Sequence, residues 1–289
     1  MLDNKEVKIE IVDNGLVSLA KNLIRKGRIS RNPIIRLSIK SLDIVRSIPY
    51  TIKRIITDKE FRAIFWMKTF KSKRVQQTTP LTCMNRYPVI FSACKDYLKD
   101  KENINILSYG CSTGEEVVTL REYFNNATII GAEINSHSLE VCRSRNLDNK
   151  IKFIVSKESE ISKYGKYDAV FCMAVLQRTP DAITSQGITS LKKIYPFEKF
   201  EKQIIELDRY VKKGGLLIIH FSQYYFEDTV VSKKYKALGN YNQDDYTSSI
   251  FDKNSNLIEE PYSRKSIFIK IMSMRIYFKR IHFSNIILI

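Results

Sequence analysis

The chain has 289 residues, of which 44% are hydrophobic, so it is long and apolar enough for one α/β domain with an appendage or for two small domains. Its apolar runs fall short of the ~20 residues that cross a bilayer, and its five Cys form no C-x-x-C pair, which excludes a zinc site of that spacing and favours reduced thiols. The formal net charge is +17. Residues 1–80 carry 18 Lys/Arg against 7 Asp/Glu, residues 81–260 carry 24 against 24, and residues 261–289 carry 6 against none. The positive charge therefore lies on the two flanks.

The first 77 residues are predicted to form a basic helical N-terminal region. Apolar residues repeat at helical spacing within residues 14–75, and Lys and Arg occupy the positions between them. Pro33 suits a first helical turn, whereas Pro49 would kink or break the helix. A basic amphipathic stretch either packs on its own domain or binds an anionic partner, so an anionic membrane surface and nucleic acid are both candidates for the flanks.

Residues 78–289 are predicted to form a second domain in which strands alternate with helices. This alternation is typical of a parallel sheet with right-handed crossovers, so we expect a Rossmann-like α/β fold with a mostly parallel sheet and helices on both faces. Residues 266–283 alternate apolar and basic residues and would either finish the sheet as an antiparallel pair or extend the basic surface. The expected strands are 104–109, 128–134, 151–155, 167–173 and 214–221, and the expected helices are 89–98, 115–124, 138–145 and 197–211.

The turn from Gly110 to Gly114 follows an apolar strand and opens an amphipathic helix. Glycines let the backbone approach a ligand closely, and unpaired N–H groups at a helix start can receive a carboxylate or phosphate. The next strand ends at Glu133, whose carboxylate can accept hydrogen bonds from both hydroxyls of a ribose. The glycine turn, the acidic residue at the end of the next strand and the spacing between them together indicate that a nucleotide-type cofactor binds at the carboxyl ends of the strands.

Three other known motifs are candidates for this turn, and two of them do not match the sequence. The dinucleotide pattern G-x-G-x-x-G fails because Ser112 occupies the second glycine position, and the phosphate-loop Lys-Ser/Thr pair is absent. The letters do match G-x-S-x-G, the nucleophile elbow of α/β hydrolases, with Ser112 as nucleophile. A serine hydrolase stays an alternative, although His220 falls inside a predicted strand and no His-Gly-Gly segment precedes the turn.

Three segments carry a family resemblance over roughly residues 78–225. Residues 108–116 are similar to W-S-A-A-x-S-T-G-E-E, residues 167–176 to F-D-x-I-x-C-R-N-V-L, and residues 211–222 to L-K-P-G-G-x-L-x-x-G-H-S. The chain thus resembles class I S-adenosylmethionine-dependent methyltransferases, most closely the chemoreceptor-type protein-glutamate methyltransferase family. Thr82 to Arg86 keeps the spacing of that family's T-x-F-F-R element, without its aromatics.

The resemblance implies S-adenosyl-L-methionine as cofactor and methyl transfer to a protein side chain or a small-molecule acceptor, with no metal. It implies cofactor-binding roles for Thr82, Arg86, Gly110, Cys111, Ser112, Gly114, Glu115, Glu133, Ile134, Met173 and Ala174. The turn residues would line the methionine part, Glu115 would meet its amino group, Glu133 would bind the ribose with Ile134 on the adenine, and Met173 and Ala174 would face the sulfonium. Arg86 would be the catalytic residue that steers a carboxylate acceptor.

One departure leaves the acceptor open. The family's Arg-Asn pair is Met173-Ala174 here, so the glutamate acceptor is not carried over. A polar residue on the adenine side is expected among Ser156, Lys157 and Glu158. We expect a cytoplasmic enzyme that can associate peripherally with a membrane through its basic flanks. The alternative function is a non-catalytic or membrane-associated module that only binds the cofactor.

Overall fold

A computed structural model describes residues 23–71, 73–178, 180–239, 249–259 and 265–271 of the chain. It divides the chain into two compact units, Met1–Arg62 and Ala63–Ile289, and their junction falls inside helix α3, Lys59–Phe70. The domain boundary expected between residues 77 and 78 stays a prediction.

The described part of the first unit is mostly helical. A short helix over residues 23–28 precedes α2, Pro33–Thr57. The Asn32 side chain caps α2 by accepting a hydrogen bond from the Ile34 N–H at 2.9 Å, and Pro33 fills the first turn as predicted. The helix continues through Pro49, so Pro49 does not break it, because a proline removes one N–H donor and the flanking turns keep theirs. A kink at Pro49 stays a prediction. The predicted helical residues 14–22 lie outside the described ranges.

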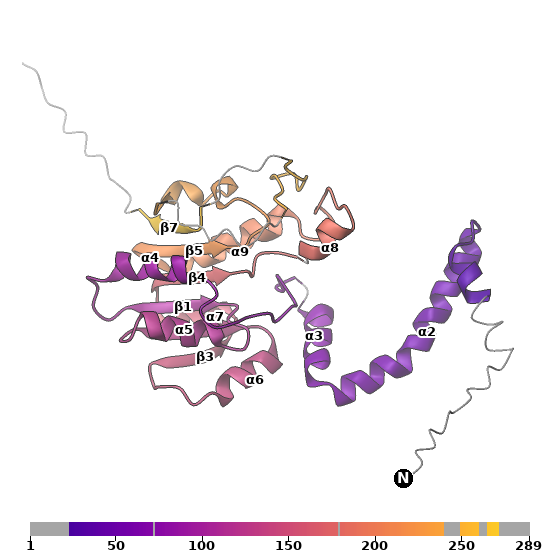
Figure 1. The fold of residues 1–289 in the computed structure, drawn as a ribbon, viewed down its shortest axis with the longest axis horizontal. Coiled ribbons are helices and arrows are strands. Elements are labelled where there is room, and N and C mark those ends of the chain that lie inside the picture. Colours follow the sequence, from indigo (N-terminus) through magenta and orange to yellow (C-terminus); the bar gives the residue numbers. More distant parts are fainter. Residues whose placement is uncertain (1–22, 72, 179, 240–248, 260–264, 272–289) are drawn as a thin grey trace, which may run out of the picture. The chain divides into compact units, whose positions relative to one another are not determined.

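The second unit contains a seven-stranded sheet in the order β3-β2-β1-β4-β5-β7-β6 (Figure 1). The first five strands pair in parallel, β7 pairs antiparallel with β5, and β6 pairs antiparallel with β7. The predicted Rossmann-like, mostly parallel fold is therefore confirmed. The strands are β1 Asn105–Tyr109, β2 Thr128–Glu133, β3 Ile151–Val155, β4 Tyr167–Met173, β5 Val211–His220, β6 Tyr235–Ala237 and β7 Ile267–Lys270.

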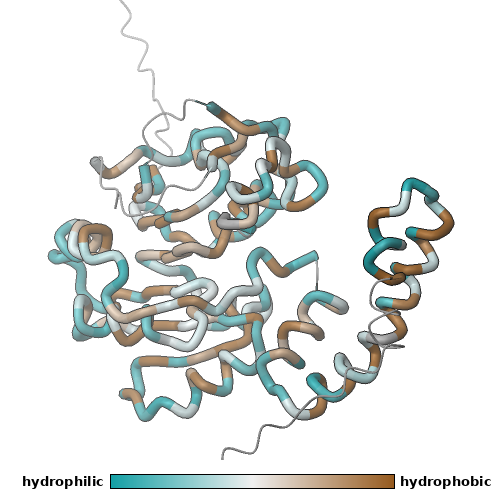
Figure 2. The backbone as a smooth tube through the Cα atoms, turned by 45° about the vertical axis from the view of Figure 1, so that its right-hand side comes forward, coloured by the Kyte–Doolittle hydropathy of each residue, from teal (hydrophilic) through white to brown (hydrophobic). Residues whose placement is uncertain are grey.

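Helices cover both faces of the sheet, because both faces of its strands carry buried apolar side chains. Figure 2 shows the hydropathy of the residues along the chain. Ile106 of β1 packs in the core beneath α4, α5 and α6, and its neighbour Leu107 packs in the opposite core with α7, α8 and α9. No helix in the described ranges is long and apolar enough to cross a membrane. The helices are α4 Pro88–Leu98, α5 Glu115–Tyr123, α6 Ser136–Ser144, α7 Glu158–Ile161, α8 Pro180–Ser185 and α9 Phe197–Tyr210.

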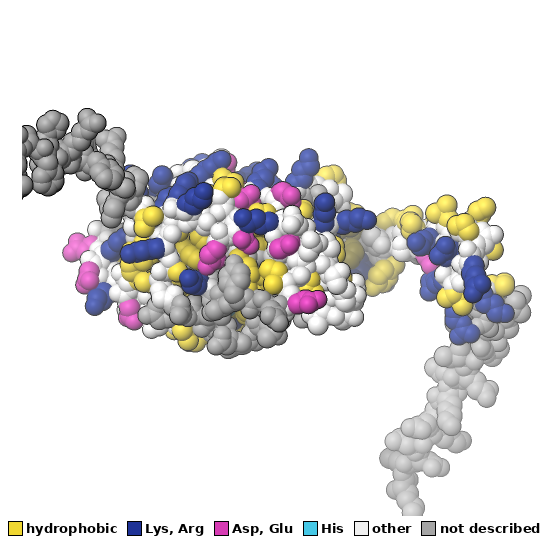
Figure 3. Space-filling model, turned by 90° about the horizontal axis from the view of Figure 1, so that it is seen from above, with side chains coloured by type: hydrophobic (Ala, Val, Ile, Leu, Met, Phe, Trp, Pro, Cys, Tyr) yellow, Lys and Arg dark blue, Asp and Glu magenta, His cyan; other side chains and the backbone are white. Residues whose placement is uncertain are grey.

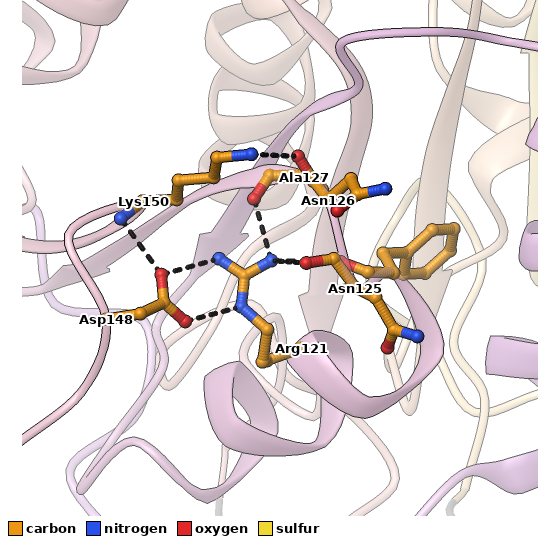
Figure 4. Close-up of polar contacts among 7 residues, drawn as sticks. Arg121, Asn125, Asn126, Ala127, Asp148 and Lys150 are labelled. Atoms are coloured by element: carbon orange, nitrogen blue, oxygen red, sulfur yellow. Dashed lines mark hydrogen bonds and ion pairs between the residues drawn. The ribbon is translucent and has the colours of Figure 1, made fainter.

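Arg121 ties the end of α5 to the segment before β3 (Figure 4). Its guanidinium donates to both carboxylate oxygens of Asp148, at 2.8 and 3.1 Å, and to the carbonyls of Asn125 and Ala127, each at 2.9 Å. The same guanidinium donates to the carbonyl of Phe124, the C-cap of α5, at 3.0 Å, so a cation satisfies the carbonyls at and just beyond the helix end. The cluster lies at the amino ends of β2 and β3, so these charges stabilise the fold on the side away from the strands' carboxyl ends.

Candidate active site

The turn after β1 depends on glycine. Gly110 has φ +77° and Gly114 has φ +97°, in the left-handed region that side chains disfavour. A Cβ on Gly110 would lie 2.5 Å from Cγ2 of Val175, closer than carbon atoms approach without strain. The Gly110 N–H donates to the Ala132 carbonyl at 2.8 Å, which fixes the turn against β2.

Glu133, the last residue of β2, is held by backbone donors. Its Oε2 accepts from the Ser112 N–H at 2.9 Å, and its Oε1 accepts from the N–H groups of Ile134 and Asn135, both at 2.7 Å. Burial raises the pKa of Glu133, while the backbone donors and the charge of Lys71 act in the opposite direction. A carboxylate offers about four lone-pair sites, and the backbone donors occupy three of those of Glu133, so one is free for a ligand and a second ligand bond would share a site with a backbone donor.

A second carboxylate, Glu116 on the first turn of α5, faces the same cavity as Glu133. Its Oε1 accepts a 2.6 Å hydrogen bond from Ser108 Oγ, and burial raises its pKa to about 7 although Arg86 favours its charged form. Glu115 points elsewhere: it pairs with Arg145 and accepts from Thr113 Oγ1 at 2.6 Å. Successive residues of a helix differ by about 100° in direction, so adjacent acids reach different surroundings.

The cavity encloses about 990 Å³, including its open mouth, at the carboxyl ends of β1, β2 and β4. This is where the strand order reverses between β1 and β4, the place where open α/β sheets bind ligands. Gly114 and Glu115 do not line it. The other site residues predicted from the sequence do: Thr82, Arg86, Gly110, Cys111, Ser112, Glu133, Ile134, Met173 and Ala174.

Residues 74–83, here named the covering segment, line the same cavity except for Val75. The sequence motifs predict only Thr82 of this segment in the site. The segment is fixed at several points: Arg74 donates to the Ser156 carbonyl at 2.7 Å, and Ser112 Oγ donates to the Pro80 carbonyl at 3.0 Å. The buried Gln76 accepts from Tyr195 OH at 2.8 Å and donates to Gln203 at 3.2 Å.

Further lining residues are not predicted by the sequence motifs. They are Glu116, the aromatic Tyr87, Phe91 and Tyr109, and Asn135 and Ser138 at the start of α6. For Asn135 the sequence does hold a signal, because Asn two residues after a strand's acidic end, followed by Ser, is a helix N-cap pattern. Of the three adenine-side candidates, Ser156 lines the cavity and Lys157 and Glu158 do not.

The lining fits an extended nucleoside that carries an amino acid. Ser156, Glu133, Gly110 and Met173 lie at the ends of four adjacent strands, β3, β2, β1 and β4, so they form a row across the sheet about 14 Å long at the usual strand spacing. The buried Gln77 Oε1 lines the cavity and has no hydrogen-bond partner among the described residues, as expected of an acceptor that a ligand satisfies.

The hydrolase interpretation of Ser112 loses its support in this geometry. Ser112 Oγ donates its proton to the Pro80 carbonyl, and the described part of the chain shows no His bonded to it. His220 ends β5, and its Nδ1 lies 2.9 Å from Ser266 Oγ.

Hydrogen bonding with Cys142 and burial raise the pKa of Cys111, and burial raises that of Cys172, so both thiols are protonated packing groups. The described residues contain no cluster of three or more metal-ligating side chains.

A Rossmann-like sheet with a glycine turn, an acidic second strand end and a cavity at its switch point defines a nucleotide-cofactor domain. The model of one family, described as a methyltransferase domain, matches residues 100–260, more than half of the chain. The chain belongs to this family of methyltransferase domains. The prediction of a methyltransferase is confirmed at this level.

Solved structures of methyltransferases are also similar to the chain. The plantazolicin methyltransferase BpumL in complex with SAH is 17% identical, with 64% of this chain and 61% of that chain covered and a TM-score of 0.35. The bifunctional kinase-methyltransferase WbdD is 16% identical, with 68% and 43% covered and a TM-score of 0.41. The chain thus spans less than two thirds of either protein. A comparison with curated protein sequences gave no match.

Proposed function

We propose that the chain is an S-adenosylmethionine-dependent methyltransferase whose cofactor lies in the cavity at the ends of β3, β2, β1 and β4. The observation that carries the proposal is the pair of carboxylates on either side of the Gly110 turn, the buried Glu133 and the half-buried Glu116, which face one cavity. One carboxylate suits the two hydroxyls of a ribose, and the other suits an ammonium group. The family match to methyltransferase domains supports the same conclusion.

In this proposal each side chain has one task. Glu133 accepts hydrogen bonds from the ribose, while Ile134 and Ser156 border the adenine. The Gly110–Ser112 backbone lies against the methionine part. Glu116 takes the role that the sequence suggests for Glu115, because Glu116 faces the cavity and Glu115 pairs with Arg145. A cationic amino group beside Glu116 would lower its raised pKa and hold it ionised.

S-adenosylmethionine supplies a methyl group already activated on a sulfonium, so the protein's contribution is mainly alignment. Orienting two reactants can contribute about 7–11 kcal/mol. Met173 and Ala174 border the expected position of the sulfonium, and the rings of Tyr87 and Phe91 exclude water from that side. The Arg86 guanidinium lines the cavity and donates to the Leu81 carbonyl at 3.2 Å, a position from which it can steer an acidic acceptor.

The acceptor is proposed only as a class: a protein side chain or a small molecule. The likeness to chemoreceptor-type enzymes would make it a glutamate carboxylate, and Arg86 suits that hypothesis. The Met173-Ala174 pair argues against simple transfer of the assignment, because two polar contacts of that family are replaced by apolar groups. A carboxylate acceptor needs no general base, whereas an amine or hydroxyl gains from one.

Methyl transfer from an isotope-labelled donor into fractionated cell extract tests this function. We expect the label to enter one fraction in the presence of wild-type protein, and to be lost with Arg86→Ala if the acceptor is acidic. Alkali then distinguishes the acceptor, because a methyl ester releases volatile methanol and a methylated amine does not. A chain that binds S-adenosylhomocysteine yet labels no fraction would instead support the alternative of a module that only binds the cofactor.

A further inference from the structure

An apolar row runs along the exposed surface of α2. Seven side chains of the row are between 47% and 72% exposed, although each is a large aliphatic. They follow one another at intervals of one to seven residues that keep to one side of a 3.6-residue helix, which spans about 37 Å over its 25 residues. The row consists of Ile34, Leu37, Ile44, Val45, Ile48, Ile52 and Ile56, and is named here the α2 apolar row.

The rest of this segment is strongly basic. Residues 23–57 contain nine Lys/Arg and a single acid, Asp43. Arg28 pairs with that acid through two hydrogen bonds, at 3.1 and 2.9 Å. Arg36, Lys40 and Lys53 are exposed, and at 100° per residue they fall outside the side of the helix that the apolar row occupies. Figure 3 shows Lys and Arg side chains next to hydrophobic ones on this unit. Long basic side chains beside an aliphatic row can extend their charged ends to an interface while the row is buried.

We propose that α2 lies flat on the surface of an anionic lipid bilayer, with the α2 apolar row in the acyl region and its Lys and Arg side chains at the headgroups. A basic amphipathic helix with a large apolar face is the pattern of interfacial helices. The proposal goes beyond methyl transfer and does not depend on it.

The positive charge and the apolar row of α2 together favour a lipid surface over nucleic acid, a second copy of α2 or the rest of the chain. Nucleic acid would satisfy the nine cations and leave the aliphatic row in water. A second copy of α2 would cover the row and bring like charges together. Residues 81–260 of the same chain carry equal numbers of acidic and basic residues, so they offer no net negative charge that would attract α2. An anionic bilayer supplies both an apolar layer and negative charge.

Cosedimentation of the full chain with vesicles tests the proposal. We expect binding to vesicles of phosphatidylcholine with about one third phosphatidylglycerol, and at least roughly tenfold weaker binding to pure phosphatidylcholine. Ile44→Gln/Ile48→Gln should weaken binding at least roughly tenfold, because it removes two members of the row with no change of charge. Ser47→Gln/Thr57→Gln, on exposed positions outside the row, is the matched control and should bind as wild type does.

Variants that lack basic side chains measure the electrostatic contribution to vesicle binding. Arg36→Gln/Lys40→Gln/Lys53→Gln should weaken binding at low salt, whereas the same number of charges removed from the second unit, in Lys166→Gln/Lys192→Gln/Lys193→Gln, should leave it unchanged. Circular dichroism and titration with S-adenosylhomocysteine show whether each variant is folded, so failure of the methyltransferase proposal remains distinguishable.

Several results would overturn the inference. One is a wild-type chain that does not sediment with anionic vesicles; another is an Ile44→Gln/Ile48→Gln variant that binds them unchanged. An effect of that variant on the oligomeric state alone would assign the row to a contact between copies. Salt-sensitive binding to RNA without vesicle binding would assign the cations to nucleic acid.

Discussion

The backbone N–H of Ser112 donates to Oε2 of Glu133 at 2.9 Å and so joins the glycine turn after β1 to the acidic end of β2. In the proposed site the turn borders the methionine part of the cofactor, and Glu133 holds the ribose of the cofactor. The bond keeps these two parts of the site next to each other. A substitution in either element should therefore affect the same binding event.

Gly110→Ala should destabilise the protein and abolish cofactor binding. The new Cβ would meet Val175 Cγ2 at 2.5 Å, in addition to the strain of φ +77°. Gly187→Ala is the control, because Gly187 has φ +59° and open space around it, so only the backbone strain of roughly 1–2 kcal/mol applies.

Adding Val175→Ala to Gly110→Ala separates the clash from the strain. Removal of the Val175 methyl groups should recover part of the lost stability in a double-mutant cycle measured by thermal unfolding. If the two substitutions are additive, the contact between Gly110 and Val175 does not explain why glycine is needed.

Glu116→Gln should change how stability depends on pH. In the unfolded chain this carboxyl ionises at its ordinary pKa of 4.5, and in the folded chain at about 7. The folded state therefore binds more protons between these values, and wild-type stability falls relative to the variant as pH rises from 4.5 to 7. Above pH 7 the variant should be more stable by at most about 3 kcal/mol, and near pH 4 the two should agree.

Denaturant unfolding across this pH range makes the comparison, with Glu140→Gln, an exposed position on α6, as control. The control should follow wild type at every pH. A Glu116→Gln difference that stays constant with pH would mean that the carboxyl has the same pKa in the folded and the unfolded chain, so that folding does not shield it from water.

Gln76→Ala should loosen the covering segment. It removes the side chain that joins Tyr195 and Gln203, residues 119 and 127 positions away, and leaves both with unsatisfied buried polar atoms. We expect a loss of about 1–3 kcal/mol in stability and weaker binding of S-adenosylhomocysteine. Gln186→Ala, at an exposed position, is the control. Unchanged affinity in Gln76→Ala would show that the segment covers the cavity without contributing to binding.

The sequence predicts the parts of the fold that local patterns determine. Apolar runs and glycine punctuation locate the five parallel strands within a few residues, and the glycine turn, the acidic strand end at Glu133 and their spacing together mark the edge of the sheet where the cavity lies. Long-range relationships are not accessible in this way. Gln76 reaches Gln203 only because the chain folds back across the sheet, and no local pattern signals that contact.

The rotation of a helix against the sheet is a second feature that the sequence does not predict. Glu115 and Glu116 are both plausible acids at a helix start, where negative charge is favoured. Which one faces the cavity depends on the rotation of α5 against the sheet, and this is set by the packing of Val117 and Leu120 in the core. Pro49 shows a related limit, because α2 tolerates it and continues to Thr57.

The most direct test of the central claim is calorimetric titration of S-adenosylhomocysteine into the wild-type chain, Glu133→Ala and the exposed control Glu140→Ala. If Glu133 accepts two ribose hydroxyls, each bond to the charged group contributes about 1.5–3 kcal/mol, so Glu133→Ala should bind at least roughly tenfold more weakly. Wild type and Glu140→Ala should bind alike, with one site per chain. Absence of binding by the folded wild-type chain, or equal affinity in Glu133→Ala, would contradict the account.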